Sequence, residues 1–505
     1  MRFTKKRRDQ QGFALIYVTF MAAFLLIPMA GLAIDFGMLY NIKARLQTAC
    51  DAAAIGAGYM LHNSTNLNDP TQVAAIKDAA QRYFNANYPT HYFGSTIVSY
   101  DSTPASSTGG KNITVRATAT VPMLLMRVLG ITQSTVGAMA VSNVRYIAMM
   151  IVVDRSGSVT RESADGIIKS ALNTFVAASS TSYLVDGTDT VGMVSFGGTW
   201  NLDYSPTLHF QSGTPNIGTA ISNIPFDTVN NASSTNTMEG LYQAWYQLYQ
   251  MNLPGSLNVI LLLTDGRPSA FTSYFTPTAN CSPLSQRSGV FTTTVGSWPP
   301  PTSNNSYGLY TSIFSTLPEN NNLAPPTNGC AYKTNQNNVY SDFSSAIPGS
   351  VGPVDNVGSG SGYPPGFSTK GTGIGTQTGY YSASLPPASC TNMKNAQCGR
   401  YSAFNAADNM AAKIRTDTTL SPMIFAIGLH YAAGSEEPPD DDWLARVAND
   451  PNYVTVGSDA SHVAAGKTVY QAGQTPGMYC TATNTLAGLN TCFQQVTSHL
   501  LRLTQ

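Results

Sequence analysis

The chain has 505 residues, enough for two or three domains with a sizeable buried core. Its 27 basic and 27 acidic residues cancel, so no net charge favours nucleic acid as a partner. Only 11% of the residues are charged, which is low for a cytosolic protein and common in secreted and cell-surface proteins.

The N-terminus predicts a membrane anchor. A basic cluster from Lys5 to Arg8 precedes a stretch without charge from Gly12 to Ile34. As a helix this stretch would be about 34 Å long, enough to cross the hydrocarbon core of a bilayer. Because basic residues stay in the cytoplasm, we expect everything after Asp35 to be exported. The alternative is a signal peptide that is cleaved near Ala33.

A second motif overlaps this stretch. Gly12-Phe13 resembles the processing site of type IV prepilins, but Tyr17 stands where those proteins carry Glu. After the apolar stretch come Asp35-Phe-Gly and the Ala-rich segment from Leu46 to Ala54. Together they resemble, over roughly residues 10–60, TadG-like proteins of the tight-adherence (Flp) pilus system. The resemblance implies a bacterial inner-membrane anchor, with a periplasmic bulk, and a role in pilus assembly.

A small α+β region is predicted next, over residues 37–145, after a tail and anchor at 1–36. The pattern of apolar residues and breakers predicts two helices followed by three strands. Asp69-Pro70 marks the start of the second helix. The helices are expected at 37–61 and 71–86, and the strands at 95–100, 113–119 and 135–144.

From Tyr146 onward, buried apolar runs alternate with helical segments. This alternation indicates an α/β fold with a doubly wound, mostly parallel sheet. Strands are expected at 147–153, 191–196, 259–263, 423–429 and 453–456, and helices at 163–178, 238–251, 406–416, 443–449 and 492–503. A cysteine-containing stretch rich in Ser, Thr, Gly and Pro, 268–399, interrupts the rhythm. We therefore predict one domain in two parts, 146–267 and 400–505, around an insertion.

Hydroxyl and carboxylate side chains follow these strands. The list is Asp154, Ser156 and Ser158 in a D-x-S-x-S motif, Thr235 before a helix, and Asp265 at a later strand end. Ligands of open parallel sheets bind beyond the carboxyl ends of the strands, so these side chains are expected at one edge. Such oxygen ligands suit hard cations. The sequence predicts a divalent cation here, Mg²⁺ first, with Mn²⁺ or Ca²⁺ as alternatives.

These three motifs, in this order, resemble the metal-ion-dependent adhesion site of von Willebrand factor A (vWA) domains. The resemblance implies a vWA fold whose cation binds a carboxylate of a partner. With the N-terminal resemblance, it predicts an anchored Flp/Tad pilus-assembly protein that binds pilus-assembly or envelope proteins and no nucleic acid. A cell-surface adhesin for host or neighbouring-cell ligands is the alternative, and a vWA fold with an empty site is another. An enzyme is disfavoured because no nucleophile–base pair, zinc site or cofactor loop stands out.

Six of the seven cysteines lie in the C-terminal half, and an even number in an exported chain predicts three disulfides. Short separations favour Cys390–Cys398 and Cys480–Cys492, which leaves Cys281 to pair with Cys330. Cys50 would then be free or intermolecular.

Five carboxylates between Glu436 and Asp442 precede Trp443. We expect them to stabilise a helix N-terminus, where negative charge is favourable. An additional cation site is the alternative.

Overall fold

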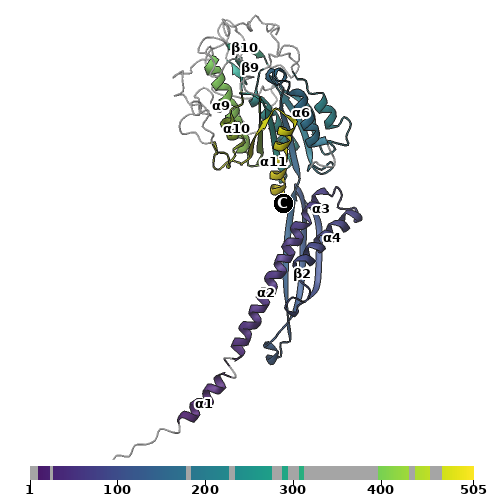
Figure 1. The fold of residues 1–505 in the computed structure, drawn as a ribbon, viewed down its shortest axis with the longest axis vertical. Coiled ribbons are helices and arrows are strands. Elements are labelled where there is room, and N and C mark those ends of the chain that lie inside the picture. The colour runs from purple at the N-terminus through teal and green to yellow at the C-terminus, as the bar shows by residue number, and fades with distance from the viewer. Residues whose placement is uncertain are drawn as a thin grey trace, which may run out of the picture. The chain divides into compact units, whose positions relative to one another are not determined.

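The structure is a computed structural model, and it describes residues 10–22, 25, 27–177, 183–198, 200–226, 234–275, 287–293, 306–311, 396–431, 438–454 and 469–504. The chain divides into two compact units, Met1–Arg145 with Gln505, and Tyr146–Thr504. Each unit is drawn in Figure 1 and has its own hydrophobic core.

The first unit combines helices with a three-stranded antiparallel sheet of order β1-β2-β3 (Figure 1). Its helices are α1 (Gln10–Met21), α2 (Ile27–Gly56), α3 (Gly58–Asn63) and α4 (Pro70–Asn87), with short 3-10 turns η2 (Tyr92–Gly94) and η3 (Met126–Leu129). Its strands are β1 (Thr96–Ser107), β2 (Gly110–Pro122) and β3 (Gln133–Arg145). The predicted helix 71–86 and the three predicted strands are present, and every strand is longer than predicted. The predicted helix 37–61 is instead divided between α2, which begins earlier, and α3.

Small residues let α2 pack closely against α4 and the sheet. Ala49 and Ala53 of α2 are fully buried, and a Cβ on Gly56 would lie 2.3 Å from the Tyr83 ring of α4. The predicted start of α4 is also present, because the Asp69 side chain accepts a hydrogen bond of 2.9 Å from the Thr71 N–H.

The apolar stretch from Gly12 to Ile34 is divided between α1 and α2. Several side chains of α1, Ile16, Val18 and Phe20 among them, are exposed. Within the described part of the chain, none of the helices has the length and apolar character needed to span a membrane.

The second unit is built on a six-stranded sheet of order β12-β11-β7-β4-β5-β6. The strands are β4 (Ile147–Asp154), β5 (Thr190–Phe196), β6 (Trp200–Thr207), β7 (Leu257–Thr264), β11 (Met423–His430) and β12 (Met478–Thr483). All neighbouring pairs are parallel except β5 with β6. The predicted mostly parallel sheet is confirmed.

Helices cover both faces of this sheet, as a doubly wound fold requires. They are α5 (Gly157–Arg161), α6 (Asp165–Leu172) with the π-helical turn η4 (Asn173–Ala177), α7 (Ile217–Ser222), α8 (Thr237–Met251), α9 (Ala396–Arg415), α10 (Asp441–Ala448) and α11 (Leu486–Thr504). Met150 and Val152 of β4 pack with α8, α9 and α10, whereas Met149 and Ile151 pack with α6, α7 and α11. Every residue of β4 is therefore buried, which explains its unbroken apolar sequence.

Some elements differ from the predictions. The edge strands β6 and β12 and the helix α7 were not predicted, and α9 begins ten residues before the predicted 406. Tyr453 and Val454 do not form the predicted strand, and residues 455–456 lie outside the described ones. A small antiparallel sheet, β8 (Ala270–Phe275), β9 (Arg287–Thr293) and β10 (Ser306–Thr311), lies within the predicted insertion. Residues 276–286, 294–305 and 312–395 are outside the described part.

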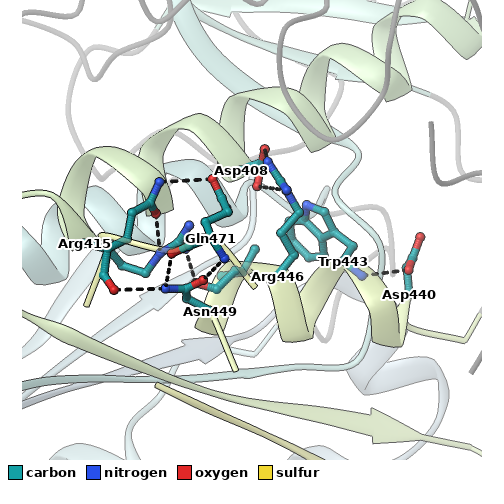
Figure 2. Close-up of polar contacts among 9 residues, drawn as sticks. Asp408, Arg415, Asp440, Trp443, Arg446, Asn449 and Gln471 are labelled. Carbon is teal, nitrogen blue, oxygen red and sulfur yellow. Dashed lines mark hydrogen bonds and ion pairs between the residues drawn. The ribbon is translucent and has the colours of Figure 1, made fainter. Parts of the chain in front are cut away.

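Figure 2 shows polar contacts that join α9, α10 and the segment before β12. Arg446 donates to both carboxylate oxygens of Asp408, at 2.8 and 3.1 Å, and both side chains are buried. Asn449, in the left-handed conformation after α10, accepts from the Gln471 N–H at 2.6 Å. Such contacts satisfy polar groups that burial would otherwise leave without partners.

The acidic run before Trp443 caps α10, as predicted. The Asp440 side chain accepts from the Trp443 N–H at 2.9 Å, and Asp441 and Asp442 occupy the first turn (Figure 2). Glu436 and Glu437 lie outside the described residues.

The predicted disulfide between Cys480 and Cys492 is confirmed, and it links β12 to α11. Cys50 is a free thiol, buried among the alanines of α2, and burial raises its pKa to about 11. Cys281, Cys330 and Cys390 lie outside the described residues, as does the side chain of Cys398. Their pairings stay predictions.

Candidate metal centre

Two neighbouring strands deliver the predicted carboxylates to one edge of the sheet. Asp154 is the last residue of β4, and Asp265 directly follows β7. The two strands pair in parallel, with Val153 opposite Leu263, so their carboxyl ends meet. Ser156 is the residue before α5 and Ser158 lies in its first turn, which turns both hydroxyls back toward this edge.

Hydrogen bonds connect these side chains. The Ser156 and Ser158 hydroxyl oxygens are 3.0 Å apart, and the Ser158 hydroxyl donates to Asp265 Oδ1 at 3.0 Å. Asp154 accepts from the Ser156 N–H at 2.9 Å through Oδ1 and from the Thr264 hydroxyl at 2.6 Å through Oδ2. A continuous network therefore joins the D-x-S-x-S motif to the end of β7.

Thr235 reaches the same place from the loop before α8. Its backbone N–H donates to the Ser269 hydroxyl at 2.9 Å, and its carbonyl accepts from the N–H groups of Ser269 and Ala270 at 2.9 and 3.1 Å. A Cβ on Gly266 would lie 3.6 Å from Thr235 Oγ1 and 3.7 Å from Ser158 Oγ. Both hydroxyls thus approach one point beside Asp265, and the five predicted residues share one site.

Burial raises the pKa of both carboxyls. Asp154 and Asp265 are each 1% exposed. Desolvation raises the pKa of Asp154, and for Asp265 the negative charge of Asp154 adds to desolvation, so its pKa lies well above the ordinary value. The opposing contributions that lower the two pKa values are hydrogen bonds from neighbouring side chains and backbone groups. Two carboxylates this close together in a buried position suit a divalent cation, whose charge would offset their mutual repulsion.

Two parts of the chain match known protein families. Residues 149–324 match the family "von Willebrand factor type A domain". The second unit contains a vWA domain. Residues 12–60 match the family of Flp pilus-assembly TadE/G-like proteins. No match was found among curated proteins.

Several solved structures resemble the chain at low identity. The PilB minor pilin from Streptococcus sanguinis is 12% identical over 83% of this chain and 81% of its own, with a TM-score of 0.31. The pilus adhesin SpaC from Lactobacillus rhamnosus GG is 11% identical over 80% of this chain and 34% of its own, with a TM-score of 0.34. The vWF domain of the type V pili tip protein Mfa5 from Porphyromonas gingivalis is 15% identical over 72% and 98%, with a TM-score of 0.32. With TM-scores this low, nothing about this chain is inferred from the likeness.

The donor set of the vWA domain fits a hard divalent cation. In the described residues, no cluster of three or more His, Cys, Asp or Glu is arranged to hold a metal ion. Here hydroxyl oxygens accompany the two carboxylates of Asp154 and Asp265. They offer further oxygen ligands without adding negative charge, and so without adding electrostatic repulsion. Oxygen-only sites of this kind suit Mg²⁺, Mn²⁺ or Ca²⁺ and not zinc.

Two further residues of the vWA domain belong to the site and were not predicted. The Tyr431 hydroxyl donates to Asp265 Oδ2, and the Thr264 hydroxyl donates to Asp154 Oδ2. Tyr431 follows β11, which pairs with β7, so it reaches the same edge. The rule that places ligands after buried strands would have put Tyr431 at this edge, because 423–429 was already a predicted strand, but it does not name Asp265 as the partner.

Proposed function

We propose that this protein is a membrane-anchored envelope protein for Flp/Tad pilus assembly, whose vWA domain binds protein partners through a divalent cation. The observation that carries the proposal is the buried pair Asp154 and Asp265, surrounded by the hydroxyls of Ser156, Ser158 and Thr235. Its role in this proposal is binding and not catalysis.

The charged and the neutral residues of the site would have different roles in binding the cation. Asp154 and Asp265 would balance the charge of the cation, Mg²⁺ first and Mn²⁺ or Ca²⁺ as alternatives, and the hydroxyls would supply neutral oxygens. When bound, the cation supplies an attractive position for a carboxylate of the partner protein. Ser158 is the most exposed of the five side chains. Its side of the site is therefore the approach for the partner.

The proposed location is the bacterial inner membrane. The match of residues 12–60 to a pilus-assembly family and the exposed apolar side chains of α1 support an anchor within residues 12–34. The basic cluster before it would keep the N-terminus in the cytoplasm and place the bulk of the chain in the periplasm. In this organisation, residues 1–36 are tail and anchor, 37–145 the adjoining region, 146–267 with 400–505 the vWA domain, and 268–399 its insertion.

Cation binding and pilus assembly are tested with one pair of variants. Asp154→Ala removes a ligand, whereas Asp165→Ala removes a carboxylate from the first turn of α6, outside the site. We expect Mg²⁺ binding by calorimetry, partner crosslinking in cells and piliation to be lost in the first variant and kept in the second. Equal Mg²⁺ affinity in both would refute the metal assignment. Normal piliation with Asp154→Ala would refute the role in assembly.

The same cells separate assembly from adhesion. We expect protease added to intact cells to leave the vWA domain uncut, because the periplasm is protected by the outer membrane. Cleavage on intact cells would instead place the domain at the surface and favour an adhesin.

A further inference from the structure

An exposed apolar tip closes the β2–β3 hairpin of the first unit. We call residues Leu124–Ile131 the hairpin tip. Its side chains Val128, Leu124 and Leu129 are 87%, 60% and 58% exposed, and Leu125 and Ile131 are exposed as well. Five large apolar side chains in eight residues, each of them exposed, are unusual for a surface facing only water. We therefore expect another apolar surface to cover the hairpin tip.

Asp35 holds the hairpin tip against α2. Its buried carboxylate accepts hydrogen bonds from three successive backbone N–H groups, those of Leu124 at 3.1 Å, Leu125 at 3.0 Å and Met126 at 2.7 Å. One helical turn earlier, a Cβ on Gly31 would lie only 2.8 Å from the Leu125 Cβ, so the two backbones are in close approach. The position of the tip along α2 is thus fixed by specific contacts.

That position coincides with the end of the apolar stretch. The stretch from Gly12 ends at Ile34, and the tip contacts α2 between Gly31 and Asp35. On α2, the side chains of Leu32 and Ile34 are exposed at the same level. The tip and this turn of α2 therefore present their apolar side chains at the same position along the helix axis. This is the position at which the proposed anchor would leave the bilayer.

The charges of the hairpin suit a phospholipid surface. No Asp or Glu occurs between Asp101 and Asp154, so β2, the tip and β3 contain no acidic side chain. Arg127 is exposed within the tip. A long basic side chain among apolar ones can bury its stem in the acyl boundary and keep its charge at the phosphates.

We propose that the hairpin tip inserts into the lipid–water interface beside the anchor, as a second membrane contact of the first unit. This inference rests on the membrane anchor of the proposed function. Apolar side chains at an interface typically reach about 5–10 Å into the headgroup and acyl boundary. A helix alone leaves the attached domain free to rotate and tilt about it. A second contact, clamped to the helix through Asp35, would restrict both motions.

Photocrosslinking of the full chain tests the contact. A benzophenone amino acid replaces Val18 in α1, Val128 in the tip or Thr108, and the protein is reconstituted in phosphatidylethanolamine–phosphatidylglycerol liposomes. Thr108 is exposed in the turn between β1 and β2, at the opposite end of the sheet. Lipid adducts are measured by mass spectrometry, and circular dichroism checks that each variant is folded.

Each pattern of adducts has one meaning. We expect lipid adducts at Val18 and Val128, with Val128 several-fold above Thr108. Adducts at Val18 alone would overturn the inference and leave the anchor intact. No adduct at Val18 would overturn the anchor. Adducts of Val128 with protein instead of lipid, in liposomes or in native membranes, would also overturn the inference, because the tip would then be a protein-docking surface.

Discussion

At the scale of single residues, Asp35 has a structural role that its sequence context does not reveal. It follows the apolar stretch directly, yet it is buried and accepts three backbone hydrogen bonds from the hairpin tip. Burial by itself raises the pKa of this carboxyl, but the N–H groups of Met126, Leu124 and Leu125 outweigh it, so the pKa lies below its ordinary value. The contacts therefore stabilise the fold at neutral pH, and this stability is lost only as acid titrates the carboxylate through its lowered pKa.

Replacing Asp35 should loosen the hairpin tip. In Asp35→Ala, the three N–H groups lose the charged acceptor that they share. We expect faster amide hydrogen exchange in a peptide that covers residues 123–132, measured by mass spectrometry. Asp51→Ala, an exposed position on the same helix, serves as the control. Identical exchange in the two variants would contradict the role of the clamp.

Tyr431 should tune the metal centre without binding the cation itself. Burial, followed by the charge of Asp265, raises the pKa of its hydroxyl, which therefore stays protonated and donates to Asp265. In Tyr431→Phe the carboxylate loses this orienting donor. Losing an outer-shell partner typically weakens metal affinity about 10–100-fold. Calorimetry with Mg²⁺ should show such a loss, while Tyr246→Phe on α8 leaves the affinity unchanged. Unchanged affinity in Tyr431→Phe would remove Tyr431 from the site.

At the scale of elements, α9 and α10 are joined through a buried ion pair. Asp408 of α9 and Arg446 of α10 form two charge-assisted hydrogen bonds (Figure 2). Phe404 of α9 and Trp443 of α10 pack edge to face in the same layer.

Breaking the pair from one side should destabilise the vWA domain strongly. Asp408→Ala leaves the Arg446 guanidinium buried without its carboxylate, which typically costs about 3–5 kcal/mol. Urea unfolding followed by tryptophan fluorescence measures the loss. The double variant Asp408→Leu with Arg446→Met removes both charges, so most of the stability should return. A double variant as unstable as the single one would show that packing, and not the unpaired charge, causes the effect.

At the scale of the whole molecule, the predicted metal ligands belong to one unit only. All five predicted ligands lie in the second unit, and none lies within Met1–Arg145. Binding energy of a ligand stabilises the cooperative unit that binds it, by an amount that grows with the ligand concentration. The two units should therefore respond differently to divalent cations.

Mg²⁺ should raise the stability of the vWA domain and leave the first unit unchanged. At a Mg²⁺ concentration of 100 times the dissociation constant, the expected gain is about 2.7 kcal/mol. Calorimetric melting in Mg²⁺ and in EDTA measures it, and hydrogen exchange assigns each transition to a unit. Asp154→Ala should abolish the difference. A shift of both transitions, or a shift that persists in Asp154→Ala, would mean that the cation acts elsewhere.

The sequence by itself determined the parts that depend on local pattern. Apolar runs identified β4, β7 and β11, and β5 with Ser195 as an exception, because strands covered on both faces have no solvent-exposed side. The rule for parallel strand ends then placed Asp154 and Asp265 together. The short separation of Cys480 and Cys492 was enough to predict their disulfide. The edge strand β6 was not predicted, because its half-exposed side chains do not form an apolar run in the sequence.

Only the tertiary structure decided which distant groups meet. Asp35 contacts backbone groups 89–91 residues away, and Tyr431 reaches Asp265 across 166 residues. No periodicity encodes these contacts. They depend on the packing of α2 along the hairpin and on the register between β7 and β11, and both are set by the summed burial of many side chains. Local pattern reports whether a residue is buried, whereas its partner is decided by how whole elements pack.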